Sequence, residues 1–252
     1  MSEIEFFTLY GFENALVVYA GAAPGVHITY LSKLFPTYRF VLVDPIRSAL
    51  HNTTNIDCRQ CLFTDETAQE FANRNDVLFI SDIRSSMPDQ ASWELVESIV
   101  SNDMAAQKKW HKIIKPKRSM LKFRLPWDPG VTKYLPGDVY LPIWGPQTTT
   151  EARLIVAPGP DILYDNTEHE WKMFYFNTVT RIGWYPHNIV AEGLDHCYDC
   201  ACEVLILQQY LQSIKQNNNI NNTIAKMSHE ISLTLNTNRT PLTSPLTFAD
   251  DG

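Results

Sequence analysis

The feature that most constrains the fold is a series of short apolar segments that end in a glycine or an acid. The β-prone run Leu16–Ala20 is followed by Gly21-Ala22-Ala23-Pro24-Gly25 and then by a helical pattern over 27–34. Arg39–Asp44 and Val77–Asp82 are further apolar runs, and both end in aspartate. Strands that alternate with helices indicate an α/β domain with a mostly parallel central sheet flanked by helices.

The later part of the chain continues this pattern and then loses it. Residues 56–63 predict a third strand, and Ala91–Trp110 has apolar residues at helical spacing. The remaining predicted elements are strands at 119–124, 152–156 and 173–180 and a helix at 195–212. From Ser213 the chain is rich in Asn, Ser and Thr. We therefore predict one domain over 1–212 and a flexible tail over 213–252, in which 224–235 could form a short helix on a partner.

The net charge of −7 conceals an uneven distribution. The stretch Gln107–Arg124 holds 8 of the 21 basic residues and no acidic one, which leaves 13 basic against 28 acidic residues elsewhere. A basic stripe on an acidic body suits contact with a polyanion along one face. A solvated helix end and turn explains the same composition equally well.

Apolar runs and cysteines bear on the cellular setting. No apolar run approaches the roughly 18–20 residues of a membrane span, and the acidic start is unlike a signal peptide, so we expect a soluble, unsecreted chain. The five cysteines are an odd number, which favours reduced thiols. Cys58-x-x-Cys61 and Cys197-x-x-Cys200-x-Cys202 have ligand-like spacing, yet the two sets lie far apart and the second shares no helix face. We expect buried thiols and no metal.

The loop after the first strand indicates the class of ligand. Doubly wound sheets bind ligands at the carboxyl ends of their strands. The Gly21–Gly25 loop lets a ligand approach the backbone, and Asp44 is placed to accept hydrogen bonds from ribose hydroxyls. The loop has neither the dinucleotide spacing GxGxxG nor the Lys-Ser/Thr of a P-loop. These absences exclude a dinucleotide or a nucleoside triphosphate as the ligand. S-adenosylmethionine, a nucleoside ligand without phosphate, remains as the candidate.

Five segments, in order, carry a family resemblance. They are Tyr19-Ala20-Gly21-Ala22-Ala23-Pro24-Gly25-Val26-His27-Ile28, Phe79-Ile80-Ser81-Asp82-Ile83-Arg84, Leu121-Lys122-Phe123-Arg124-Leu125-Pro126-Trp127, Glu151-Ala152-Arg153-Leu154 and Glu170-Trp171-Lys172-Met173-Phe174-Tyr175. Together they resemble the poxvirus cap-specific mRNA 2′-O-methyltransferases, which double as the small subunit of poly(A) polymerase. The resemblance runs from about Glu5 to Leu211. It implies a Rossmann-like S-adenosylmethionine-dependent methyltransferase fold and a cytoplasmic location.

The resemblance also implies a Lys-Asp-Lys-Glu catalytic tetrad, of which Asp82, Lys122 and Glu151 are present. A lysine titrates at about 10.4, so Lys122 can act as general base only if burial or a neighbouring cation lowers its pKa. The family's first lysine precedes the cofactor loop, whereas the earliest lysine here, Lys33, follows it. Three explanations are open for the missing first lysine. The natural chain starts upstream of Met1, or three of the four tetrad residues suffice for catalysis, or the protein no longer catalyses the reaction.

The remaining site residues are also implied by the resemblance. Those expected to bind the cofactor are Gly21, Gly25, His27, Asp44, Arg47, Phe63, Thr64 and Asp82. Those expected to bind the cap are Trp127, which stacks on 7-methylguanine, and Asp128 and Glu170, which accept its N–H groups. Those expected to contact RNA phosphates are Arg84, Lys108, Lys109, Lys112, Lys115, Lys117 and Arg118.

Three functions are consistent with these residues. The first is methylation of the 2′-hydroxyl of the first transcribed nucleotide of capped mRNA, cap 0 to cap 1. The second is a weakly active or inactive cap- or RNA-binding subunit that assists a viral poly(A) polymerase catalytic subunit or RNA polymerase. The third is a ribosomal RNA methyltransferase, which would not need Trp127 or Glu170.

Overall fold

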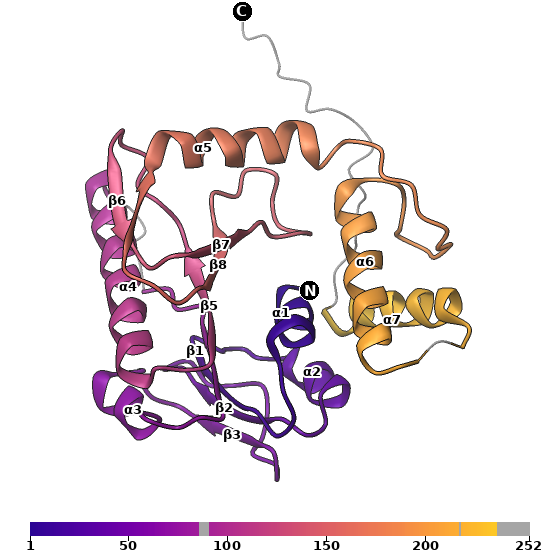
Figure 1. Ribbon diagram of the computed structural model, residues 1–252, viewed down its shortest axis with the longest axis horizontal. Coiled ribbons are helices and arrows are strands. Elements are labelled where there is room, and N and C mark those ends of the chain that lie inside the picture. Colours follow the sequence, from indigo (N-terminus) through magenta and orange to yellow (C-terminus); the bar gives the residue numbers. More distant parts are fainter. Residues whose placement is uncertain (86–90, 217, 236–252) are drawn as a thin grey trace, which may run out of the picture. The chain divides into compact units, whose positions relative to one another are not determined.

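The computed structural model describes residues 1–85, 91–216 and 218–235 (Figure 1). The chain divides into two compact units. The sheet unit comprises Tyr10–Leu141 and Glu151–Thr167, and the helical unit comprises Met1–Leu9, Pro142–Thr150 and the chain from Glu168 on. The structure thus differs from the expected single domain over 1–212, because the segment after β9 builds a core of its own.

The sheet unit is built on seven strands in the order β3-β2-β1-β4-β5-β8-β7. A separate two-stranded sheet pairs β6 with β9. The bounds are β1 Leu16–Ala20, β2 Arg39–Val43, β3 Ile56–Arg59, β4 Val77–Ser81, β5 Arg118–Phe123, β6 Val131–Tyr134, β7 Gly137–Tyr140, β8 Ala152–Val156 and β9 Ile162–Asp165.

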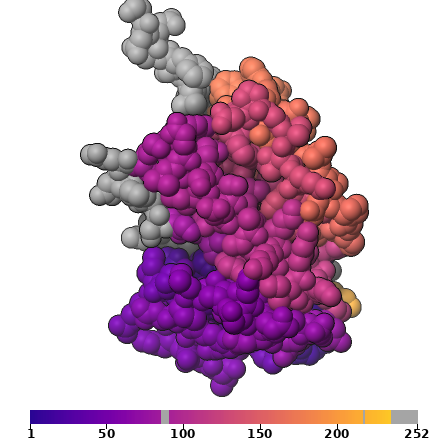
Figure 2. All heavy atoms as spheres, turned by 90° about the vertical axis from the view of Figure 1, so that its left-hand side faces the viewer, coloured from indigo at the N-terminus to yellow at the C-terminus, as the bar shows by residue number. Residues whose placement is uncertain are grey.

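The first five strands of the large sheet are parallel, and β8 and β7 add antiparallel strands at one edge. All residues of β1 and β4 are buried, because strands covered on both faces are apolar throughout. Figure 1 shows α3 (Asp65–Glu70) and α4 (Trp93–Ile114) on one side of the sheet and α2 (Ile28–Leu34) on the other. The long α4 forms much of the face seen in Figure 2. The predicted α/β class with a mostly parallel sheet is confirmed.

The helical unit has a buried ion pair at its centre. Arg181 and Asp199 are each about 1% exposed, and the guanidinium Nη2 lies 2.5 Å from a carboxylate oxygen. The same guanidinium donates to the carbonyl oxygens of Gly145 and Pro146, which ties the segment 142–150 to the helices. The helices are α1 Ser2–Tyr10, α5 Asn166–Tyr175, a π-helical segment Phe176–Thr180, α6 Tyr198–Ser213 and α7 Ile220–Leu235.

One predicted strand is wrong. Residues 173–180 form the end of α5 and the π-helical segment. Met173, Phe176 and Asn177 are buried, whereas Phe174 and Tyr175 are about half exposed or more. This burial follows a helical period, which β-prone composition alone does not reveal.

The prediction of a flexible tail from Ser213 is wrong for the part that the structure describes. Residues 220–235 form α7, which contacts α6. Ile224, Met227 and Ile231 recur on one helical face and are buried. The helix suggested for 224–235 therefore exists, but it packs on the chain's own α6. Residue 217 and residues 236–252 of the predicted tail lie outside the described residues.

No helix among the described residues combines the length and the apolarity that crossing a membrane requires.

Candidate active site

The loop after β1 is shaped by Gly21. This residue has φ +79°, and a Cβ there would lie 2.6 Å from the backbone nitrogen of Ile83 and 2.7 Å from the carbonyl of Asp82. Only glycine permits both the left-handed backbone and this close approach. The Gly21–Gly25 loop therefore packs directly on the backbone that carries Asp82. Gly25 also has a positive φ, +76°.

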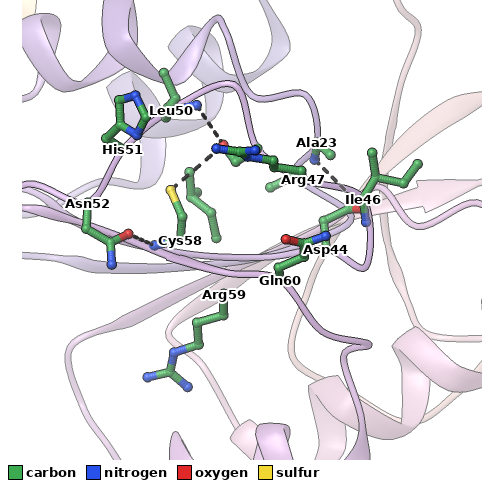
Figure 3. A pocket seen from close by; sticks show the side chains of 13 residues that line it. Ala23, Asp44, Ile46, Arg47, Leu50, His51, Asn52, Cys58, Arg59 and Gln60 are labelled. Atoms are coloured by element: carbon green, nitrogen blue, oxygen red, sulfur yellow. Dashed lines mark hydrogen bonds between the residues drawn. The ribbon is translucent and has the colours of Figure 1, made fainter.

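Asp44 connects the loop after β1 with the segment after β2. Its carboxylate accepts hydrogen bonds from the backbone N–H groups of Ala23 (3.0 Å) and Ile46 (2.8 Å). A cavity of about 320 Å³ opens beside it, at the carboxyl ends of β1, β2 and β3 (Figure 3). Its volume lies in the range of small-ligand sites.

The cavity contains only part of the predicted cofactor set. Asp44 and Arg47 line it, and Gly21 and Gly25 belong to the loop from which Ala22 and Ala23 line it. Sequence reasoning missed most of its other lining, because nothing in a loop sequence indicates which side chains turn inward. These residues include Ile46, Ser48, Leu50, His51, Asn52 and Gln60.

Three predicted cofactor residues have structural neighbours of their own. The Phe63 ring is buried between Phe79 and Trp110, at centroid distances of 5.7 and 4.8 Å. Thr64 is the N-cap of α3, and its side chain accepts a hydrogen bond from the N–H of Thr67. His27 is the N-cap of α2, and its ring lies edge-on to Tyr19. None of these three residues lines the cavity described above.

The predicted catalytic residues meet at the same edge of the sheet. Asp82 follows β4, Lys122 lies on β5, and Glu151 precedes β8. The Lys122 amine lies 3.0 Å from a carboxylate oxygen of Asp82 and 3.0 Å from one of Glu151. The Lys122 side chain is 17% exposed, that of Asp82 is 31% exposed and that of Glu151 is 24% exposed. The residues carried over from the family therefore form one contiguous group.

A second cation, Arg153, completes this group. It lies on β8 directly opposite Lys122 in the strand pairing. Its guanidinium contacts Asp82 at 3.1 Å and Glu151 at 2.7 Å, and its side chain is 18% exposed. Sequence reasoning did not assign Arg153 a role, although it lies in the motif Glu151-Ala152-Arg153-Leu154. We name Asp82, Lys122, Glu151 and Arg153 the charge cluster.

The charge cluster changes the ionisation of two of its members. Burial disfavours the ionised form of Glu151, but Arg153 and Lys122 outweigh it and lower the pKa of Glu151 to about 2. Burial likewise disfavours the charged form of Arg153. The attraction of Asp82 and Glu151 is stronger than this effect, so the pKa of Arg153 is raised. Arg84, which is exposed, adds a further contact to Glu151 at 3.0 Å.

The predicted cap residues fall in both units. Trp127 is 44% exposed and follows β5 in the sheet unit. Its ring contacts that of Trp93 at 4.7 Å, and the Arg124 guanidinium lies 4.8 Å from its centroid. Asp128 is exposed, and its backbone carbonyl accepts a hydrogen bond from Asn166. Glu170 is exposed on α5, in the helical unit.

The basic stripe is not a free cationic face. Lys108 and Lys112 both pair with Asp161, and Lys109 pairs with Asp65. The ends of Lys117 and Arg118 lie over the rings of Phe12 and Tyr10. Acids and aromatic rings from distant parts of the chain therefore compensate charge that is unopposed in the local sequence.

The section of the stripe from Lys115 to Arg118 lies away from the charge cluster. Lys115 caps α4, and Arg118 begins β5, so both are at the amino edge of the parallel strands. At about 3.3 Å per residue, the backbone of Arg118 is roughly 13 Å from that of Lys122. A basic residue that does contact the charge cluster from outside is Arg84, which pairs with Glu151.

These features define an α/β chain with a ligand cavity and a charge cluster at the carboxyl edge of its sheet. A sequence model of the family described as "Poly A polymerase regulatory subunit" matches residues 2–237. The chain belongs to this family. The resemblance expected from the five segments is thereby confirmed.

Relatives with curated names carry a more specific description. The chain is 29% identical over 188 residues to the cap-specific mRNA (nucleoside-2′-O-)-methyltransferase of fowlpox virus, a match of 67% of this chain and 60% of that protein. It is also 29% identical over 194 residues to the protein of the same name from myxoma virus, strain Lausanne, at 67% and 55%. The chain thus spans less than two thirds of these relatives.

Among solved structures, the chain is similar to part of bluetongue virus VP4, described as "a multifunctional RNA-capping production-line". The TM-score is 0.53 at 13% identity, and the match covers 68% of this chain and 30% of the other. At this identity the similarity concerns the fold. The predicted Rossmann-like architecture is confirmed by the sheet order and by this likeness.

Proposed function

We propose that the chain methylates the 2′-hydroxyl of the first transcribed nucleotide of capped mRNA, with S-adenosylmethionine as methyl donor. The observation that carries this proposal is the charge cluster, built on the backbone that packs against the Gly21 loop. The names of the fowlpox and myxoma relatives support the choice of reaction.

The residues beside the cavity fit S-adenosylmethionine. A carboxylate, Asp44, follows β2, where ribose hydroxyls would be bound, and Ala22 and Ala23 of the loop after β1 line the same cavity. The lining includes apolar Ile46 and Leu50 for an adenine ring, and no P-loop lysine is present among the lining residues. When bound, the cofactor supplies an electrophilic methyl group on a sulfonium.

Within the charge cluster we assign Lys122 to the 2′-hydroxyl. Its amine holds the hydroxyl and accepts its proton as the oxygen attacks, in an in-line displacement that depends on alignment. Asp82 and Glu151 orient the amine, since both lie 3.0 Å from it. Arg153 binds the same two carboxylates and limits the negative charge that Lys122 experiences.

For the cap, we assign Trp127 to stack on the cationic 7-methylguanine. In the structure the Arg124 guanidinium lies over the Trp127 ring, so 7-methylguanine would compete with this guanidinium for the aromatic face. Asp128, which follows Trp127 in the sheet unit, is proposed to accept the N–H groups of the base. The role of Glu170 remains a prediction from the family resemblance. Arg84 and the basic stripe are proposed to contact RNA phosphates, with Arg84 nearest to the reacting ribose.

The test is methyl transfer from labelled S-adenosylmethionine to short RNAs that differ only in the cap. We expect labelling of capped RNA, located at the 2′-oxygen of the first nucleotide, and at least a hundredfold less with Lys122→Met. Equal labelling of capped and uncapped RNA would instead favour a ribosomal-type substrate. No transfer by a folded chain that binds S-adenosylmethionine would reject the proposal.

The alternative function is a cap- or RNA-binding subunit of a polymerase. The description of the family favours it, because that description names a regulatory subunit of poly(A) polymerase. A viral poly(A) polymerase catalytic subunit or an RNA polymerase would be the partner, in the cytoplasm. Cap binding and stimulation of tail extension without methyl transfer would support this alternative.

A further inference from the structure

Outside the charge cluster, the start of α6 in the helical unit brings two thiols and a carboxylate together. Cys197 is the N-cap of α6 and Cys200 lies in its first turn, and both are buried. Their sulfur atoms are 3.3 Å apart. A carboxylate oxygen of Asp195 and the two sulfurs all lie within 4.8 Å of one another.

The Asp195 carboxylate is held beside the two thiols by the backbone. The Asp195 carboxylate accepts a hydrogen bond from the backbone N–H of Cys197 at 2.7 Å, which fixes it beside the thiols. In the described part of the chain, neither a lysine nor an arginine forms an ion pair with Asp195.

The neighbouring histidine offers a fourth donor. His196 directly precedes Cys197, and its Nδ1 atom is buried without a hydrogen-bond partner in the described residues. Its ring packs on Trp184 at 4.2 Å and on His187 at 4.9 Å. His196 is not within the 4.8 Å group formed by the two sulfurs and the carboxylate oxygen, so its ring would have to reorient to add a nitrogen ligand.

We propose that Asp195, Cys197 and Cys200, with His196 as fourth ligand, form a structural zinc site. Zinc prefers four sulfur, nitrogen and oxygen ligands at about 2.0–2.3 Å in tetrahedral geometry. Two sulfurs on one such ion lie roughly 3.8 Å apart, close to the 3.3 Å observed. This ligand set differs from the all-cysteine set considered in the sequence analysis, because the structure places Cys197 and Cys200 beside Asp195 and not beside the other cysteines.

A disulfide between Cys197 and Cys200 is the competing outcome. It would use the same two sulfurs, but it would leave the Asp195 carboxylate beside a neutral bridge without a cation. The zinc site uses all three groups, and its charge compensates theirs. It would hold the start of α6 to the segment 187–196, where the His187 ring already contacts the backbone carbonyl of Asp195.

The experiment measures the metal content of the full chain, purified with a thiol reductant and supplemented with zinc before exhaustive dialysis. We expect about one zinc ion per chain by mass spectrometry. The double variant Cys197→Ser, Cys200→Ser should lose at least nine tenths of it, whereas the matched control Cys58→Ser, Cys61→Ser should retain it. Replacing zinc by Co²⁺ should give a thiolate-to-cobalt charge-transfer band in the wild type and the control alone.

A second variant guards against loss of folding. Asp195→Asn keeps both thiols, and we expect it to bind zinc at least tenfold more weakly in competition with a chelator. Chelation should also lower the thermal midpoint of the wild type. Less than about one zinc per ten wild-type chains with thiols shown free by alkylation, or a Cys197–Cys200 disulfide under the same conditions, would overturn the proposal. Neither readout depends on methyl transfer.

Discussion

Arg153 is a strand residue whose importance becomes visible only through its contacts. It faces Lys122 across the β5–β8 pairing and contacts both carboxylates that contact Lys122. Two carboxylates and one lysine would leave an excess negative charge in a half-buried place, and a second cation balances it. We therefore infer that Arg153 is a positioning residue, which holds Asp82 and Glu151 beside Lys122.

We expect Arg153→Met to reduce kcat for capped RNA by about 10- to 100-fold, because the two carboxylates lose their second cation. KM for S-adenosylmethionine should change little, and Arg153→Lys should recover part of the rate. The control is Arg74→Met, which removes an exposed ion pair with Asp76 outside the charge cluster and should leave kcat unchanged and stability within about 1 kcal/mol. An unchanged kcat in Arg153→Met would contradict a positioning role.

The ionisation of Glu151 predicts how stability depends on pH. Its pKa is lowered to about 2 in the folded chain, from 4.5, so the folded state binds fewer protons than the unfolded state between these values. The stabilisation is complete above pH 4.5 and is lost as the pH falls toward 2. Denaturant unfolding of wild type and Glu151→Gln should show a stability difference that shrinks by about 2–3 kcal/mol across this range. A constant difference would contradict this assignment.

At the scale of elements, the connections after strands determine the site. The Gly21 loop, the segment after β2 and the residues after β4 converge because parallel strands end at the same edge. The loop after β1 reaches the backbone of Asp82 only because Gly21 lacks a side chain. The geometry of the Gly21–Gly25 loop and that of the charge cluster are therefore coupled.

Gly21→Ala tests this coupling. Its Cβ would lie 2.6 Å from the Ile83 nitrogen at a φ of +79°, so we expect a loss of stability of about 2 kcal/mol or more. S-adenosylmethionine binding, measured by calorimetry, should weaken as well. Gly145→Ala is the matched control, since the nearest atoms to its Cβ are 3.9 and 4.0 Å away. Equal stability of the two variants would be inconsistent with the packing described.

Helix α7 gives a second prediction at this scale. Ile224 is 1% exposed, whereas Leu233 is 66% exposed. Ile224→Asp places a charge in the apolar face toward α6 and should cost about 3 kcal/mol or more. Hydrogen exchange of α7 should become fast in this variant and remain slow in Leu233→Asp. Similar exchange in both variants would mean that the packed face has been misassigned.

At the scale of the whole molecule, two cores support two compact units. The sheet unit rests on apolar strands, whereas the helical unit is centred on the buried pair Arg181 and Asp199. The Arg181 side chain donates to three backbone or side-chain oxygens besides Asp199. Loss of one partner would leave an uncompensated buried charge.

Arg181→Met should therefore destabilise the helical unit by about 3–5 kcal/mol, and pairing it with Asp199→Leu should recover part of that loss. Hydrogen exchange resolved by peptide is the measurement. We expect protection to fall in α6 while β1, β4 and β5 keep theirs. A uniform loss across both units would show that they unfold as one.

The amino-acid sequence by itself determined six strands of the sheet unit, β1 to β5 and β8, whereas β6, β7 and β9 were not predicted. Leu16–Ala20 and Val77–Ser81 are recognisable because a strand covered on both faces is apolar throughout. Asp82, Lys122 and Glu151 were assigned through the family resemblance of the segments that contain them. Residues 173–180 were mispredicted because β-prone side chains also suit a helix when only one of its faces is buried.

Only the tertiary structure decided how charges are paired. Arg153 meets Asp82 across 71 residues, and Lys112 meets Asp161 across 49. The same holds for the cavity lining, since backbone turns decide which side chains of 46–52 point inward. Strand formation depends on neighbours in the sequence, whereas electrostatic compensation depends on neighbours in space. The fold class was therefore predictable, and the second cation of the site was not.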